Sequence, residues 1–197
     1  MSLRFLYLIL LYILLILGCQ KKESFNGILY DKPAYNFCLK TEENGKVKEV
    51  CLKDILKEKD IVLVFFGFTH CPDVCPAAME VLKNTMKKLD EDERKRVQVV
   101  FISVDPERDT PKLVSQYAKY FDESFLGLTG TPEEIKEVAK AYKVFYEKVP
   151  QKGSNDYLVN HSALIYLITK DGKIKLIYSA SKQKPNLIAE DVKKLLD

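Results

Sequence analysis

Two cysteines four residues apart, Cys71 and Cys75, are the residues of this sequence best suited to chemistry. They lie in the segment GFTHCPDVCP (residues 67–76), which follows the apolar run 61–66 and precedes a stretch with helical apolar spacing. A strand, a turn and a helix are predicted, with both sulfurs at the helix N-terminus, where unpaired N–H groups and the helix dipole favour thiolate over thiol. Two neighbouring thiolates can chelate a soft metal such as Cu(I), or they can form a disulfide and exchange it.

The three-residue gap between the cysteines differs from the Cys-x-x-Cys of thioredoxin-type oxidoreductases, so the pattern alone does not make the chain an enzyme. A structural role is the alternative, because Cys75 continues the apolar spacing of Ala78 and Leu82 on the predicted helix. We prefer a functional role, since Pro72 and Pro76 restrict the backbone of a strand-to-helix turn that carries two cysteines.

Two histidines are the other candidate ligands. His161 lies in the segment YLVNHS (157–162), at the entry to a predicted hairpin that the fold inferred below brings beside the cysteine turn. His70 adjoins Cys71 and is a poor ligand, because the side chains of adjacent residues rarely converge. A lone histidine is more often a structural residue than a ligand, so both roles stay open for His161.

The N-terminus predicts export. Arg4 is followed by the apolar run 5–17 and then by Gly18 and Cys19, which is typical of a signal peptide over residues 1–18. The run is shorter than the ~20 residues that span a bilayer, so cleavage before Cys19 and lipidation of that cysteine, as in bacterial lipoproteins, are expected. An uncleaved signal-anchor is the alternative. In both cases the remaining chain is attached to a membrane outside the cytoplasm, where disulfides persist.

The remaining chain is predicted to be one domain on a tether. Residues 19–34 combine the lipidated N-terminus with a polar, unpatterned tether, and residues 35–197 form the domain. The 197-residue chain is 47% hydrophobic and 30% charged, with a net charge of +3. Such a mild charge argues against nucleic acid as a partner.

Residues 37–52 predict a β-hairpin around Asn44 and Gly45, which tolerate positive φ in a two-residue turn. Pairing about this turn matches charge with charge and apolar with apolar residues. The same register places Cys38 opposite Cys51 as a non-hydrogen-bonded pair, whose Cα atoms approach to about 4.5 Å. A structural Cys38–Cys51 disulfide is therefore predicted, with two free thiols as the alternative.

The rest of the chain alternates predicted strands and helices. Strands are expected at 61–66, 97–104, 125–128, 162–169 and 173–178, and helices at 76–89, 111–120, 132–142 and 186–196. Thr110 and Thr131 are the predicted N-caps of two helices, each followed by proline. This order is typical of an α/β thioredoxin-like sandwich, here with an added N-terminal β-hairpin and an inserted helical segment.

Three separated segments resemble the Sco/SenC family of copper-binding assembly factors for cytochrome c oxidase: residues 67–76, the segment SVDPERDTP (103–111) and residues 157–166. The resemblance covers most of residues 35–196. It implies a thioredoxin-like domain that binds one copper, as Cu(I) or Cu(II), through Cys71, Cys75 and His161. It also implies the copper-site (CuA) subunit of the oxidase as partner, and a tuning role for Asp73 in the cysteine loop.

One residue departs from the family pattern. The family commonly has Asp directly before the histidine, where this chain has Asn160. An aspartate at that position can orient an imidazole or raise its basicity, so weaker binding by His161 is expected. The motif at 103–111 is interpreted from its residues only as a turn that leads into a Thr-capped helix.

The leading hypothesis is a copper chaperone, in which an open coordination position lets a thiolate of the oxidase subunit take over the metal. The competing hypothesis is a thiol:disulfide oxidoreductase that reduces cysteines of the oxidase copper site or of another exported protein. It uses Cys71 and Cys75 but does not need His161. A copper or oxidant sensor ranks last, because the sequence contains no separate output element.

Overall fold

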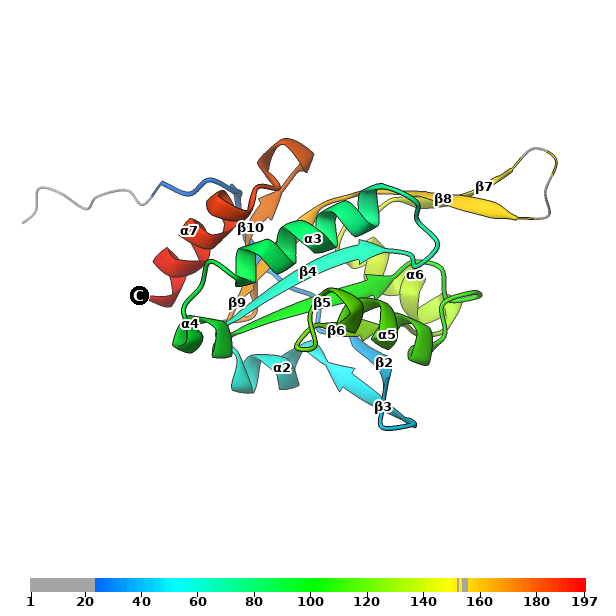
Figure 1. Cartoon of the computed structure of the whole chain (residues 1–197), viewed down its shortest axis with the longest axis horizontal. Helices are drawn as coiled ribbons and strands as arrows, with labels where there is room; N and C mark the ends of the chain where they lie inside the picture. The colour runs from blue at the N-terminus through cyan, green and yellow to red at the C-terminus, as the bar shows by residue number, and fades with distance from the viewer. Residues whose placement is uncertain (1–23, 152, 154–155) are drawn as a thin grey trace, which may run out of the picture.

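The structure is a computed structural model that describes residues 24–151, 153 and 156–197. Its centre is a six-stranded mixed sheet (Figure 1). In spatial order the strands are β1 (Ile28–Pro33), β10 (Lys173–Tyr178), β9 (Ile165–Thr169), β4 (Ile61–Gly67), β5 (Val97–Ser103) and β6 (Leu126–Leu128). β4 pairs in parallel with β5 and antiparallel with β9, and all of its residues are buried. A strand covered on both faces explains why this run is continuously apolar rather than alternating.

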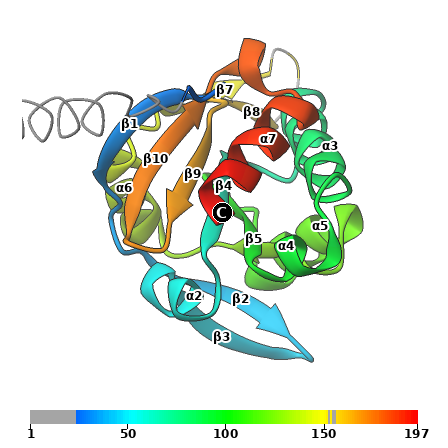
Figure 2. The same ribbon diagram turned by 90° about the vertical axis from the view of Figure 1, so that its left-hand side faces the viewer.

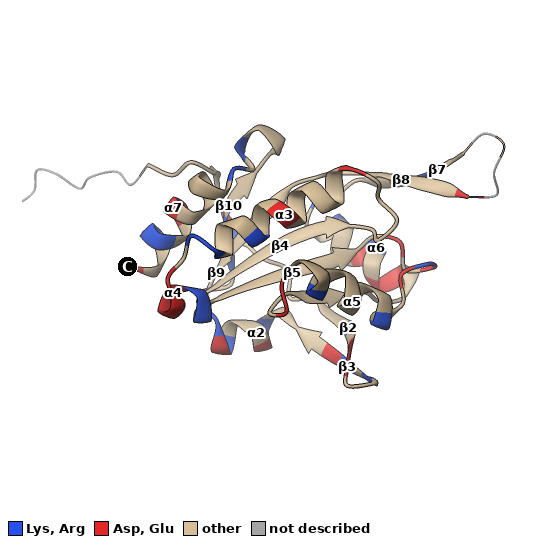
Figure 3. Ribbon diagram, viewed as in Figure 1, with Lys and Arg blue, Asp and Glu red and all other residues tan. Residues whose placement is uncertain are grey.

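Helices cover both faces of the sheet. α3 (Val74–Met86) and α7 (Pro185–Leu196) contact each other on one face, and α6 (Pro132–Ala141) lies on the other (Figure 2). Phe65 and Phe66 of β4 point to opposite faces, and Phe66 packs on Tyr142, just after α6, with ring centroids 5.3 Å apart. α5 (Pro111–Phe121) packs along β6, and the short α4 (Glu91–Lys95) precedes β5. Basic and acidic residues both occur on α3, α4, α6 and α7 (Figure 3).

The element order confirms the predicted thioredoxin-like sandwich. The predicted N-caps are also present, since the Thr110 and Thr131 hydroxyls each accept a hydrogen bond from a backbone N–H of the following helix turn. The helix predicted over 76–89 begins two residues earlier, at Val74. Pro76 fits inside its first turn because the N–H groups there have no intrahelical partner.

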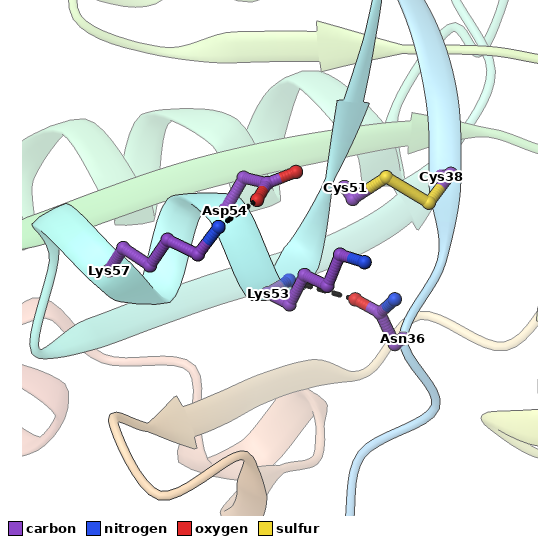
Figure 4. The surroundings of a disulfide bond; sticks show 6 residues. All are labelled: Asn36, Cys38, Cys51, Lys53, Asp54 and Lys57. Carbon is purple, nitrogen blue, oxygen red and sulfur yellow. Dashed lines mark hydrogen bonds and ion pairs between the residues drawn. A yellow bond between two sulfur atoms is a disulfide. The ribbon is translucent and has the colours of Figure 1, made fainter.

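The predicted N-terminal hairpin is formed by β2 (Cys38–Glu43) and β3 (Lys46–Cys51). Both turn residues have positive φ angles, 52° at Asn44 and 75° at Gly45. The register is the predicted one, so Cys38 lies opposite Cys51. The structure joins these cysteines by a disulfide, with their Cα atoms 4.0 Å apart (Figure 4).

Several elements have no counterpart among the predicted ones. They are α2 (Leu52–Glu58), α4, the 3-10 turn η1 (Ala180–Lys182), and a second hairpin of β7 (Tyr146–Pro150) and β8 (Tyr157–His161). Because β8 takes up the chain as far as His161, the strand predicted from residue 162 begins only at Ile165. The second hairpin projects from the body (Figure 1), and its mostly exposed or half-buried residues show no apolar alternation. For α2, the Asn36 side chain accepts a hydrogen bond from the Lys53 N–H (2.8 Å; Figure 4).

The tether predicted over residues 19–34 needs correction. Ile28–Pro33 form β1, an edge strand antiparallel to β10. The buried Asp191 of α7 holds the start of this strand, because its carboxylate accepts hydrogen bonds from the backbone N–H groups of Asn26 (2.9 Å) and Gly27 (2.8 Å). An edge strand with mostly exposed residues carries no alternating apolar pattern, which is why the sequence did not indicate it.

The predicted signal peptide over residues 1–18 and the predicted lipidation of Cys19 lie outside the described residues. Within the described part of the chain, no helix has the length and apolar character needed to cross a membrane.

Candidate metal centre

The two motif cysteines meet where β4 ends and α3 begins. Cys71 lies in the turn and is half-buried, whereas Cys75, in the first turn of α3, is 0% exposed. The Cys71 Sγ accepts a hydrogen bond from the Cys75 backbone N–H (3.4 Å), so it uses one of the unpaired donors of the helix N-terminus. Gly67 leaves room for the second sulfur, since a Cβ at this position would lie 2.7 Å from Cys75 Sγ.

His161 reaches the cysteines from the end of β8. Its Nε2 lies 3.3 Å from Cys75 Sγ, and its Nδ1 lies 3.2 Å from the Ser162 carbonyl oxygen. The rings of Phe65 and Phe68 meet the imidazole edge to face, with centroids 6.1 and 5.8 Å away. The imidazole is therefore held between a carbonyl acceptor and two aromatic walls, with one nitrogen directed at the sulfurs.

These three side chains form a compact set of two soft sulfur donors and one borderline nitrogen donor. The two sulfurs and one imidazole nitrogen all lie within 4.8 Å of one another. A tetrahedral ion with bonds of about 2.3 Å to sulfur and about 2.0 Å to nitrogen holds such a pair of ligand atoms about 3.5 Å apart. The 3.3 Å between Cys75 Sγ and His161 Nε2 is close to that separation. The site therefore has both the donor chemistry and the spacing for one soft or borderline metal ion.

The two thiols have very different acidities. The pKa of Cys71 is lowered to about 4, chiefly because the Cys75 thiol donates a hydrogen bond to its thiolate, with help from His161 and the Asp73 and Cys75 backbone N–H groups. The pKa of Cys75 is raised, because its proton is held in that hydrogen bond and because burial penalises its charge. Cys71, the more accessible of the two cysteines, therefore loses its proton first.

The other residues singled out by the sequence lie farther from the metal-ligand set. His70 is exposed, and its Nδ1 lies 3.1 Å from the Thr69 hydroxyl rather than at the sulfurs. Asp73 is the exposed N-cap of α3 and contributes its backbone N–H to Cys71, not its carboxylate. Asn160 is exposed opposite Glu147 of β7, because adjacent strand residues face opposite ways. The Ser162 carbonyl oxygen, and not the Asn160 side chain, lies against the imidazole Nδ1, and weaker metal binding by His161 stays a prediction.

Sequence reasoning missed the role of the turn after β5. Asp109 is 0% exposed and accepts hydrogen bonds from the Thr69 N–H (2.9 Å), the Thr69 hydroxyl (2.6 Å) and the Ser103 hydroxyl (2.6 Å). It thereby fixes the loop two residues before Cys71. The available signal was three acidic residues, Asp105, Glu107 and Asp109, within six positions of the end of a buried strand, since a carboxylate that becomes buried requires hydrogen-bond donors.

The fold and the site together define a thioredoxin-like protein with a dithiol and imidazole centre. The model of the SCO1/SenC family matches residues 48–197, and the chain belongs to this family. The human protein named SCO1 homolog, mitochondrial, is 40% identical over 129 residues, which are 65% of this chain and 43% of that protein. The chain thus matches less than half the length of this relative.

Solved structures agree in fold. The apo Sco1 protein of Thermus thermophilus is 39% identical, with a TM-score of 0.76 over 89% of this chain and 99% of that one. Arabidopsis thaliana ScoI with copper bound is 37% identical, with a TM-score of 0.72 over 83% and 97%. Two others are each 28% identical over 86% of this chain: a SCO1/SenC family lipoprotein of Bacillus anthracis (TM-score 0.68, 98% of that chain) and BsSco, described as a member of a family of cytochrome c oxidase assembly proteins (TM-score 0.62, 96%).

Proposed function

We propose that this chain is a membrane-attached, extracytoplasmic copper chaperone that delivers copper to the CuA site of cytochrome c oxidase. Cys71, Cys75 and His161 are its metal ligands in this proposal. The observation that carries it is the convergence of two sulfurs and one imidazole nitrogen within 4.8 Å. The copper-bound relative and the oxidase assembly relative support the metal and the partner.

Copper suits this donor set in both oxidation states. Thiolates favour Cu(I), and an added imidazole also suits Cu(II). Cys71 supplies a thiolate at neutral pH, since its pKa is about 4, and the metal displaces the remaining proton of Cys75 on binding. Three protein ligands leave a position open, where a thiolate of the acceptor enters and displaces the donor ligands one by one. Copper then passes between proteins without being free in solution.

Attachment to a membrane is part of the same proposal. The N-terminal sequence, with its apolar run 5–17 followed by Cys19, supports a lipid anchor, as does the description of the Bacillus anthracis relative as a lipoprotein. The first strand of the domain, β1, begins at Ile28, nine residues beyond Cys19. A lipid anchor at Cys19 raises the effective concentration of the domain near a membrane-embedded oxidase.

The direct test measures copper stoichiometry and copper spectra of the full chain in detergent. We expect one copper per reduced chain, loss of binding in Cys71→Ser and Cys75→Ser, and an altered Cu(II) spectrum in His161→Ala. His70→Ala is the matched control and is expected to behave as wild type, because its imidazole is exposed and directed at Thr69. If the fully reduced wild type binds no specific copper, the chaperone proposal is wrong.

A thiol:disulfide oxidoreductase is the second candidate, favoured by the unequal acidities of the two cysteines. A low-pKa, half-exposed thiolate next to a buried thiol is the arrangement of an attacking and a resolving cysteine. Its substrates would be the cysteines of the oxidase copper site or of another exported protein. Oxidase assembly in cells that carry His161→Ala separates the two functions, because undiminished assembly would favour the oxidoreductase.

A further inference from the structure

The hairpin that carries His161 is tied to the body of the protein at its other end. Tyr157 begins β8, four residues before the histidine, and its hydroxyl donates a hydrogen bond to Asp105 Oδ1 (2.7 Å). Asp105 lies in the turn after β5 and is 0% exposed. A buried carboxylate therefore holds the tyrosine side chain in place.

Arg108, from the same turn, makes two further contacts with Tyr157, a hydrogen bond and a cation–π contact. Its Nη1 donates a hydrogen bond to the Tyr157 carbonyl oxygen (3.0 Å), and its guanidinium carbon lies 3.7 Å from the centre of the Tyr157 ring. Its Nε donates to Asp105 Oδ2 (2.6 Å), which fixes the plane of the guanidinium. Backbone, ring and hydroxyl of one residue are thus all engaged by the Asp105–Arg108 pair, which we call the Tyr157 clamp.

The turn that carries the Tyr157 clamp also contacts the loop that carries Cys71. The Arg108 guanidinium carbon is 6.0 Å from the centre of the Phe68 ring, and that ring meets the His161 imidazole edge to face. In the same turn, Asp109 binds the loop residue Thr69. One short segment therefore contacts both the loop that carries Cys71 and the strand that carries the histidine.

We propose that Arg108, supported by Asp105, is a positioning residue that sets the distance between His161 and the cysteine pair through Tyr157. The effect on copper binding rests on the proposed function, whereas the contacts of the Tyr157 clamp do not depend on it. With the clamp intact, the metal has three ligands. Without it, β8 moves away from α3 and leaves a two-thiolate site, which still suits Cu(I) but no longer provides the imidazole that suits Cu(II).

The test compares Arg108→Gln with Lys148→Gln in the full chain. Lys148 is the matched control, because its Nζ also lies over the Tyr157 ring, 4.9 Å from the centre, but its side chain is 42% exposed and its ion pair with Glu107 lies at the surface. Amide hydrogen exchange of the metal-free protein is the first measurement. We expect the β8 amides to exchange about tenfold faster in Arg108→Gln, with α3 and β4 unchanged, and no change in Lys148→Gln.

Copper spectra are the second measurement. Arg108→Gln is expected to retain one Cu(I) per chain and to show the Cu(II) spectrum of His161→Ala, and the double variant is expected to match His161→Ala alone. Wild-type β8 exchange and a wild-type Cu(II) spectrum in Arg108→Gln would overturn the inference. Faster exchange shared equally by all elements would also overturn it, since Arg108 would then be a general stabiliser.

If Arg108→Gln does not fold, Tyr157→Phe is the second variant. It removes only the hydroxyl bond to Asp105 and is expected to accelerate exchange of the β8 amides less than Arg108→Gln. If the wild type binds no copper, the proposed function fails, whereas the exchange measurement on the metal-free protein still tests the clamp.

Discussion

The acidity of Cys71 leads to a prediction that needs no metal. The Cys75 thiol, assisted by His161, lowers the pKa of Cys71 from its usual 9.0 to about 4. A lowered pKa means that the thiolate is present above about pH 4 and is lost as the pH falls through that value. Alkylation of Cys71 by iodoacetamide should therefore be nearly independent of pH between about 6 and 9.

The lowered pKa of Cys71 is detected from how the alkylation rate depends on pH, rather than from the rate at one pH. An ordinary thiol with a pKa of about 9 is roughly 1% thiolate at pH 7, whereas Cys71 is essentially all thiolate. This gain of about 100-fold is offset, because nucleophilicity falls by roughly 0.4 to 0.5 log units per unit of pKa. The rate of the ordinary thiol nevertheless rises several hundredfold from about pH 6 to pH 9, and that of Cys71 does not.

The assay follows iodoacetamide modification of the reduced, metal-free full chain from pH 3 to 9, with peptide mass spectrometry to identify the modified cysteine. Cys75→Ala removes the largest cause of the shift and is expected to raise the pKa of Cys71 strongly. His161→Ala removes a smaller cause and should raise it less. If the wild-type rate climbs about tenfold per pH unit through pH 7 and 8, the thiol is not activated and the reasoning is wrong.

The remaining predictions concern the support of the site. Gly67→Ala places a Cβ 2.7 Å from Cys75 Sγ and should destabilise the fold by about 1–3 kcal/mol through overpacking, seen as a lower denaturation midpoint; an unchanged midpoint would mean that the sulfur moves freely. Asp109→Asn removes the charge from three hydrogen bonds of a buried carboxylate. It should lower the free energy of unfolding by about 2 kcal/mol and speed amide exchange in the cysteine loop. Unchanged exchange there would show that the Asp109 charge is not needed to hold the loop. The double replacement of Cys38 and Cys51 by alanine opens a loop of sequence separation 13 and should cost about 3 kcal/mol while copper binding persists; lost binding would contradict a purely structural disulfide.

Features that depend on neighbours in the sequence were predictable. The hairpin register and the Cys38–Cys51 pair follow from a two-residue turn, because the turn sets the pairing of every residue outward from it. The caps at Thr110 and Thr131 follow likewise, since a cap bonds to an N–H only three residues away.

Features that depend on partners distant in the sequence were not predictable. β1 is mostly exposed and the second hairpin is mostly exposed or half-buried, so neither shows the apolar alternation by which a strand is identified. The roles of Asp105, Arg108 and Asp109 were hidden for a related reason. A short polar turn has the same sequence pattern whether its carboxylates face water or are buried against another loop.

The sequence by itself determined that Cys71 and Cys75 share a helix N-terminus, because a strand, a proline-rich turn and a helix all lie within a few residues of them. Only the tertiary structure decided that His161, 86 positions from Cys75, comes within 3.3 Å of it, and that Asn160 beside it faces away. The physical reason is that a strand directs alternate side chains to opposite faces. Which face meets the cysteines depends on the pairing of β8 with β7 and on the clamp at Tyr157, and both involve residues far apart in the chain.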